Sequence, residues 1–218
     1  FSQVGNSSEV RSARSELETV CAELNPLETE EAVEVSTLAE LNEQMTEGKL
    51  NRNVNVTETI TIGEPFCLDL NGHTMQFTGE TGSVLQITGG TFTLDDSAGG
   101  GKITGGKGMP DPHTKHSDYG QCGGGVFVCA GATFVMNGGE ITGNEANTGG
   151  GIYIDRSIEN VPGNFDMYGG SITNNTAKTH EGGGIFCYGV GEINPVHGDI
   201  YITSNRTDTT TDLGGGGI

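Results

Sequence analysis

The sequence predicts an all-β fold: a single-stranded, right-handed parallel β-helix of about five coils with an N-terminal helical cap. Three observations predict it. Glycine-rich runs recur at intervals of 26 to 33 residues, short β-like stretches lie between them, and no apolar period of 3.6 residues occurs after Gly48. Repeats of this length with three short strands are typical of a solenoid in which each coil stacks its strands on the next coil.

Four glycine runs mark the start of the repeated units. The runs begin at Gly123, Gly149, Gly182 and Gly214. The β-branched residues that follow them are Val126, Ile152, Ile185 and Ile218, which lie 26, 33 and 33 residues apart. Because glycine adopts positive φ without a steric clash, each run is expected to form a tight corner.

Two ladders are expected inside the stack. One consists of isoleucines that fill the core, namely Ile103, Ile141, Ile172 and Ile202. The other consists of asparagines two residues after a repeated threonine, which should bond backbone groups at stacked corners: Asn144, Asn175 and Asn205. Burial of apolar columns, at about 25 cal/mol per Å², is the expected main source of stability.

The chain divides by composition into three segments. Residues 1–35 are acidic, with eight glutamates between Glu9 and Glu34, and are expected to be partly helical or loosely ordered. Residues 36–48 should form the capping helix, because Thr37 and Glu40 make a capping box and Gly48 can end it. Leu38, Leu41 and Met45 would share the apolar face of this helix, at 36–48. Residues 49–218 should form the β-helix, which is expected to continue beyond this chain.

Charge and cysteine content exclude several classes of partner. The 29 acidic and 10 basic residues give a formal charge of −19, which repels nucleic acid and anionic membrane surfaces, so neither nucleic-acid binding nor membrane insertion is expected. The five cysteines show no Cys-x-x-Cys spacing, and no metal site or cofactor is predicted from them. An acidic surface attracts divalent cations, which leaves calcium as a candidate ligand.

Three sequence strings can be compared with known families. They are LDLNGHT from Leu68, GGTFTLDDSAGGGKITGG from Gly89 and MYGGSITNNTA from Met167. They resemble β-helix repeat surface proteins, described as adhesin-like, of gut-dwelling and mostly Gram-positive bacteria. The resemblance covers the chain from about Ser36 onward. It implies an extracellular, secreted or cell-wall-attached protein that contacts a host or dietary glycan or a surface protein, and it supplies no catalytic residues.

Two functions therefore stand beside each other. The first is a non-enzymatic surface module that serves as a stalk or as a glycan- or protein-binding segment. The alternative is a polysaccharide lyase or glycoside hydrolase, since enzymes of these kinds share the pectate-lyase-like fold. Such enzymes need several carboxylates converging on one bond. Asp95 and Asp96 are adjacent, but in their glycine-rich setting they indicate a corner.

Two groups of residues are candidates for binding. The first is an aromatic stripe on the outer side of one strand column, formed by Phe127, Tyr153 and Phe186. It either stacks on sugar rings or packs under inserted loops or a partner. The second is a polar insertion that either coordinates a ligand or metal or is an exposed loop; it holds Asp111, His113, His116, Asp118 and Cys122.

Ice binding is a remote alternative. It rests on a threonine column formed by Thr104, Thr142, Thr173 and Thr203. Ice-binding surfaces of this type usually need a second threonine column beside the first. The second column here is assigned as Gly, Glu, Ser and Tyr, including Glu140 and Tyr201. Threonine also has a high intrinsic preference for strands, which explains the first column without any ligand.

Overall fold

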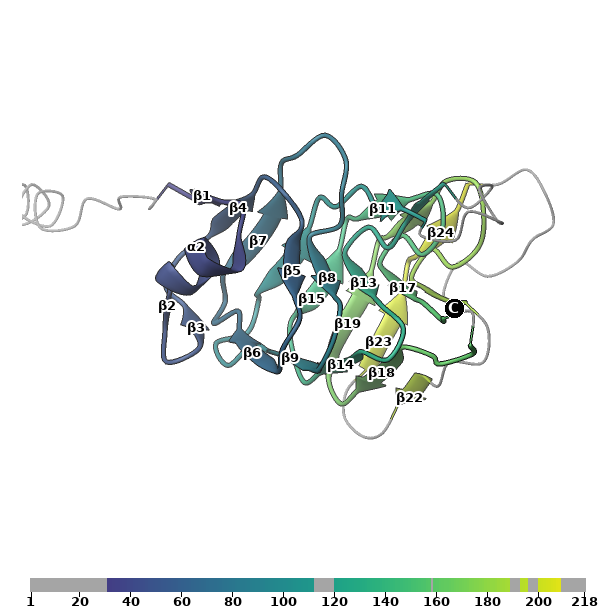
Figure 1. Ribbon diagram of the computed structural model, residues 1–218. Coiled ribbons are helices and arrows are strands. Elements are labelled where there is room, and N and C mark those ends of the chain that lie inside the picture. Colours follow the sequence, from purple (N-terminus) through teal and green to yellow (C-terminus); the bar gives the residue numbers. More distant parts are fainter. Residues whose placement is uncertain (1–30, 112–119, 158, 189–192, 196–199, 209–218) are drawn as a thin grey trace, which may run out of the picture. The chain divides into compact units, whose positions relative to one another are not determined.

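The computed structural model describes residues 31–111, 120–157, 159–188, 193–195 and 200–208 (Figure 1). The chain divides into two units, residues 1–31 and residues 32–218. The expectation of partial helix in the first unit therefore falls almost wholly outside the described residues. The second unit is mostly β, with one short helix, and its large sheets consist mainly of parallel strands. Within the described residues, no helix is both long enough and apolar enough to cross a bilayer.

Three large sheets make up this second unit. Sheet A consists, in order, of β1 (Val33–Val35), β4 (Val54–Val56), β7 (Thr74–Phe77), β10 (Lys102–Thr104), β15 (Glu140–Thr142), β19 (Gly170–Thr173) and β23 (Ile200–Thr203). Sheet B consists of β2 (Met45–Thr46), β3 (Lys49–Leu50), β6 (Phe66–Asp69), β9 (Thr91–Asp95), β14 (Thr133–Met136), β18 (Asn164–Met167) and β22 (Ile193–Pro195). Sheet C consists of β5 (Ile60–Ile62), β8 (Leu85–Ile87), β13 (Val126–Val128), β17 (Ile152–Ile154) and β21 (Ile185–Cys187).

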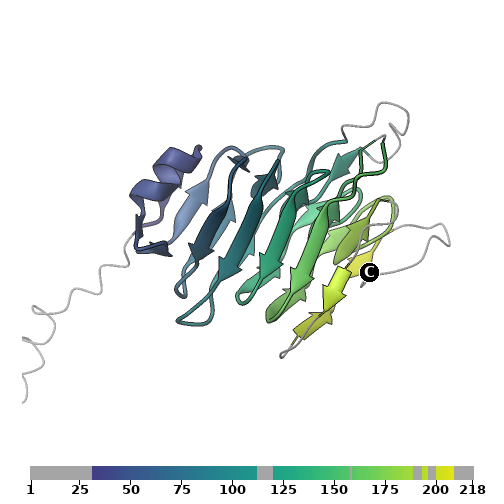
Figure 2. The same cartoon turned by 60° about the horizontal axis from the view of Figure 1, so that its bottom comes forward.

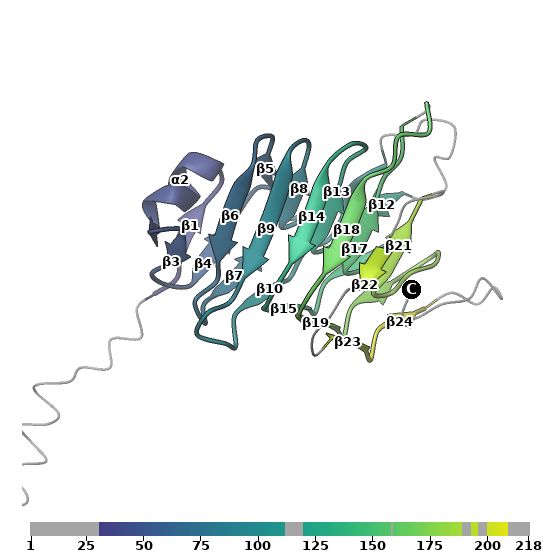
Figure 3. The ribbon, with the colours of Figure 1, turned by 90° about the horizontal axis from the view of Figure 1, so that it is seen from below.

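The chain visits these sheets in rotation. From β4 to β10 it runs through sheets A, C and B in that order, twice, and returns to sheet A. Each strand then lies parallel to the strand of the same sheet from the preceding turn, as the rows of arrows in Figures 2 and 3 show. A further, short column of strands follows sheet A in the later turns; it consists of β16 (Glu145–Ala146), β20 (Thr176–Ala177) and β24 (Arg206–Thr207).

Matching side chains stack across the turns and form a continuous core. In sheet A the cross-strand partners are Ile103, Ile141, Ile172 and Ile202, the arrangement expected from the repeat. In sheet B the inward-facing rings of Phe92, Phe134 and Phe165 stack with centroids 5.4 and 5.0 Å apart. These rings are completely buried. The recurring apolar positions are therefore what aligns one turn with the next.

The Asn ladder, formed by Asn144, Asn175 and Asn205, joins the turns at the corner after sheet A. The Oδ1 atom of Asn175 accepts hydrogen bonds from the backbone N–H and the side-chain amide of Asn144, both at 3.0 Å. The side-chain amide of Asn175 donates to the carbonyl of Ile141 at 2.9 Å and to Oδ1 of Asn205 at 3.0 Å. Each side chain thus satisfies backbone groups that the corner would otherwise leave buried without partners.

The glycine runs serve two different purposes at the next corner. Their first residues, Gly123, Gly149 and Gly182, have φ values of 64°, 63° and 70°, which only glycine adopts without strain. Their second residues lie against backbone of the neighbouring turn. A Cβ added to Gly124, for example, would fall on the carbonyl oxygen of Gly150. The run is therefore needed both for the turn and for close stacking.

The N-terminal helix is shorter than expected. Helix α2 (Leu38–Glu43) has Thr37 as its N-cap, and Thr37 and Glu40 form the predicted capping box. It ends at Gln44, because the following residues pair as the antiparallel strands β2 and β3. The expectation that Gly48 ends the helix is wrong, since this residue has a φ of 79° in the turn between those strands. Met45 consequently lies in a strand.

The parallel stack also begins earlier than the sequence indicated. Strand β1 precedes the helix and pairs with β4 through Val33 and Val54, whereas the strands were expected only from residue 49. Sheets A and B each have seven strands, more than about five coils would supply. The turns before residue 99 lack triple-glycine runs, so their strands, such as β4 and β5, carry no strong repeat signal.

Candidate functional site

The predicted aromatic stripe exists as a column on the outer side of sheet C. Phe127, Tyr153 and Phe186 are direct cross-strand partners on β13, β17 and β21. Their rings stack with centroids 5.0 Å apart for the first pair and 5.4 Å for the second. The residues on either side of them, such as Val126 and Val128, face the core. The column follows from the alternation of side chains along each strand.

Two members of this column do not face solvent. Phe127 is 1% exposed and Tyr153 is completely buried. Together with Cys122 they form a second apolar cluster, outside the main core, onto which Met109, Cys129, Phe186 and Tyr188 pack. Cys122 and Met109 belong to the insertion, so the stripe packs beneath that segment, the other possibility left open by the sequence. A sugar therefore has no access to the faces of Phe127 and Tyr153.

The insertion is held at its base by a short antiparallel pair. Strand β11 (Met109–Pro110) pairs with β12 (Gln121–Cys122), and the N–H of Asp111 donates to the carbonyl of Gly120 at 2.9 Å. The structure thus places Asp111 and Cys122 at this base. The other predicted candidates, His113, His116 and Asp118, lie outside the described residues.

The cysteines of the cluster are poor nucleophiles and poor metal ligands. Burial raises the pKa of the Cys122 thiol strongly, and the nearby carboxylates of Asp111 and Asp155 raise it further. Burial also raises the pKa of the Cys129 thiol. The Gln86 amide donates a hydrogen bond to its sulfur at 3.6 Å, which lowers the pKa but does not outweigh burial. Thiolates, not thiols, attack electrophiles and bind metals, so both residues act as small apolar groups in this cluster.

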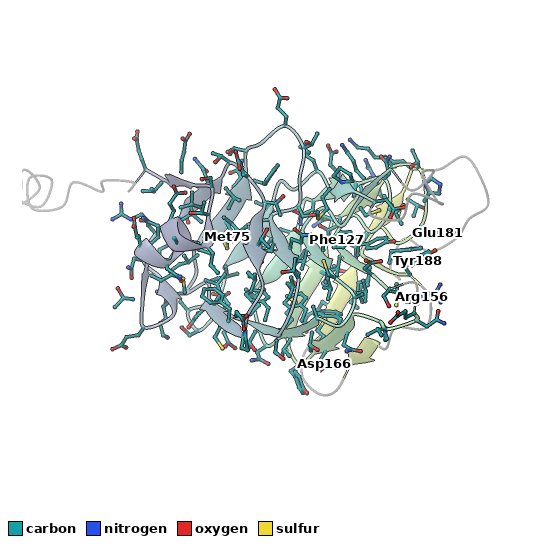
Figure 4. The ribbon with its side chains drawn as sticks, in the orientation of Figure 1. Met75, Phe127, Arg156, Asp166, Glu181 and Tyr188 are labelled. Carbon is teal, nitrogen blue, oxygen red and sulfur yellow. The ribbon has the colours of Figure 1, made fainter. Side chains whose placement is uncertain are left out.

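A second loop, which begins at Arg156, adds to the rim of the cluster. The guanidinium of Arg156 lies over the ring of Tyr188, 5.1 Å from its centroid, and donates to Oδ1 of Asn160 at 2.8 Å. Figure 4 shows Arg156 and Tyr188 next to each other on the side where Phe127 lies. The only sequence signal for this contact is the pair of interruptions after β17 and β21. Two non-repeating loops thus meet the same column.

The acidic residues of the early turns serve corners. The Asp96 carboxylate accepts hydrogen bonds from the N–H of Gly72 at 2.7 Å and of Gly101 at 2.8 Å. Asp69 accepts from two backbone N–H groups and pairs with Lys49 at 3.0 Å. Partial burial by itself raises the pKa of Asp69. Hydrogen bonds, most of all those from Ser97, outweigh this effect and lower the pKa to about 2. Among the described residues, no three His, Cys, Asp or Glu side chains are grouped so that they could hold a metal ion.

The threonine column lies on the outer face of sheet A, beside a more varied second column. Thr142 and Thr173 are hydrogen-bonded through their hydroxyl groups at 3.1 Å, and the Thr173 hydroxyl also donates to the carboxylate of Glu140. The residue in register with Glu140 in the preceding turn is Lys102, so the glycine assigned to that place from the sequence is wrong. Tyr201 continues this second column and is 56% exposed.

Comparisons with protein-family models, with curated proteins and with solved structures find no match for this chain. The interpretation of the site therefore depends on its geometry. That geometry consists of a stack of parallel strands, the base of an insertion packed on the outer side of sheet C, and a polar face on sheet A that carries an exposed aromatic ring.

Proposed function

We propose that this chain is a right-handed β-helix module of an extracellular surface protein, either secreted or attached to the cell wall. In this proposal helix α2 covers the first end of the stack. The module is a non-enzymatic, adhesin-like segment that holds inserted loops in fixed positions and uses them or its faces to contact a host or dietary glycan or a protein. The resemblance in the repeat strings and the acidic surface support this location and role.

The observation that carries the proposal is the second apolar cluster. Phe127 and Tyr153 are as fully buried as residues of the main core, although they point away from it. Burying one large aromatic side chain contributes about 1.5–3 kcal/mol, so this cluster ties the base of the insertion firmly to sheet C. Binding residues are commonly found on loops that a rigid scaffold positions, and this arrangement is of that kind.

The enzymatic alternative has less support. A glycoside hydrolase needs carboxylates directed at a bound sugar. The carboxylates of Asp69 and Asp96 instead accept hydrogen bonds from backbone N–H groups at corners of the stack. These contacts give both residues a structural role, and the repeat provides the reason for their positions.

The test is a binding screen of the full chain against immobilised glycans and extracellular proteins, with calcium and again with chelator. We expect capture of at least one glycan or protein. Capture of none under either condition would leave only the stalk and overturn the binding function.

A variant shows whether the insertion contributes to binding. Phe127→Ala should free the base of the insertion, so that proteolysis near residues 105–122 accelerates and binding of a ligand held by the insertion weakens, while the β circular dichroism is kept. Thr61→Ala is the matched control, because Thr61 is an exposed member of the same outer column. Unchanged binding by Phe127→Ala, despite faster proteolysis, would contradict presentation of the ligand site by this insertion.

A further inference from the structure

The outer face of sheet A carries two polar columns in register. One holds Lys102, Glu140, Ser171 and Tyr201, and the other holds Thr104, Thr142, Thr173 and Thr203. The buried isoleucine column lies between them and points inward. Because neighbouring strands are about 4.8 Å apart, this face offers hydroxyl, carboxylate and amine groups at regular intervals across the strands.

Hydrogen bonds hold the centre of this face in one arrangement. Thr173 contacts both the Thr142 hydroxyl and the Glu140 carboxylate, and Lys102 lies 3.4 Å from the other oxygen of that carboxylate. These groups remain partly exposed, and hydroxyl and carboxylate oxygens can accept further hydrogen bonds. A surface ordered before binding loses little side-chain entropy when a ligand arrives.

Tyr201 supplies an apolar surface beside these polar groups. At 56% it is the most exposed of the large hydrophobic side chains in the described part of the chain, ahead of Val161 and Tyr168. It stands next to Ser171 in the same column, two strands beyond Glu140. An exposed tyrosine ring with hydrogen-bonding neighbours suits a ligand that has both C–H faces and hydroxyl groups.

Charge narrows the ligand further. The chain carries a formal charge of −19, which repels acidic polymers. At the centre of this face the single carboxylate of Glu140 is offset by Lys102. A neutral polymer with hydroxyl groups at regular intervals fits these properties.

We propose that the outer face of sheet A binds a neutral oligosaccharide, which stacks one sugar ring on Tyr201 and hydrogen-bonds with Thr173 and Glu140. This inference rests on the proposed binding function and adds to the insertion on sheet C a second binding surface, with a named ligand class. It differs from the role expected for the aromatic column of sheet C, whose rings are buried.

The test is calorimetric titration of the full chain with neutral cello-, manno- and xylo-oligosaccharides. We expect binding of at least one series, with the affinity lowered about tenfold or more by Tyr201→Ala and about fivefold by Thr173→Val. Tyr201→Phe should retain most of the affinity because it keeps the ring. Tyr168→Ala is the matched control, since it removes an exposed tyrosine from the corner before β19, and it should bind as the wild type does.

The outcomes separate this inference from the proposed function. Binding that Tyr201→Ala and Thr173→Val leave unchanged would overturn the assignment to sheet A while keeping a glycan-binding module. No binding of any neutral oligosaccharide, together with capture of a protein or a charged glycan in the screen, would overturn this inference alone. Inhibition of ice growth that Thr173→Val abolishes, without oligosaccharide binding, would assign the face to ice instead.

Discussion

Replacement of Asn175 by alanine removes the central member of the Asn ladder, and its cost can be worked out from the structure. The side chain is completely buried and takes part in four hydrogen bonds, two with Asn144, one with the Ile141 carbonyl and one with Asn205. At about 1 kcal/mol net for each bond, Asn175→Ala should lower the free energy of unfolding by about 4 kcal/mol. The backbone N–H of Asn144 and the Ile141 carbonyl would lose these partners inside the stack.

The assay is equilibrium denaturation by urea, followed by far-ultraviolet circular dichroism and analysed for the wild type and each variant. Asn55→Ala is the matched control, because Asn55 lies on the outer face of sheet A and is only partly buried. We expect the control to lie within about 0.5 kcal/mol of the wild type. A loss below about 1 kcal/mol for Asn175→Ala, or one equal to that of the control, would refute the role given to the ladder.

Three further predictions concern packing, pH and thiol chemistry. Gly124→Ala should destabilise the fold by about 2 kcal/mol or more, since its Cβ would meet backbone of the neighbouring turn. Gly99→Ala should cost about 1 kcal/mol, because this residue has a positive φ but open space around it. Thermal unfolding of both variants checks this. The pKa of Asp69 is about 2, against 3.8 ordinarily, so its carboxylate stabilises the fold fully above about pH 4, and this stabilisation disappears towards pH 2. Between these pH values the free energy of unfolding of the wild type should therefore fall by about 1–2 kcal/mol more than that of Asp69→Asn. Denaturation of both proteins at each pH checks this. A thiol reagent at pH 8 should modify exposed Cys67 readily and buried Cys122 only after unfolding, as mass spectrometry of the modified peptides would show; equal rates would contradict the burial of the second cluster.

The sequence predicts those parts of the fold in which the same residue type recurs at the same place in each turn. Ile141 and Ile172, or Asn144 and Asn175, lie about one repeat apart and are partners in space, so aligning the chain with itself is enough to pair them. The helix cap at Thr37 is also readable, because a capping box involves only neighbouring residues.

The remaining features depend on contacts between segments that do not repeat. The helix ends early because Met45 and Thr46 pair with a following strand, and strand pairing outweighs their helical spacing. Strand alternation places the aromatic stripe on the outer side of a sheet, and the sequence leaves open whether that side is exposed or covered by inserted loops. Alternation does not show what covers that side. The insertion that ends at Cys122 has no counterpart in other turns, so the packing of this segment on Tyr153 had no sequence signal.

The central claim is that this module binds its ligand without changing it. The most direct measurement is to incubate the full chain with whichever polysaccharide it captures, with calcium and with chelator, and then to determine the chain length and end groups of the recovered polymer. The account predicts that the polymer is retained on the protein and recovered at its original length under both conditions. Shortened chains, new reducing ends or unsaturated ends that increase with time would contradict it and assign the stack to the polysaccharide-cleaving enzymes.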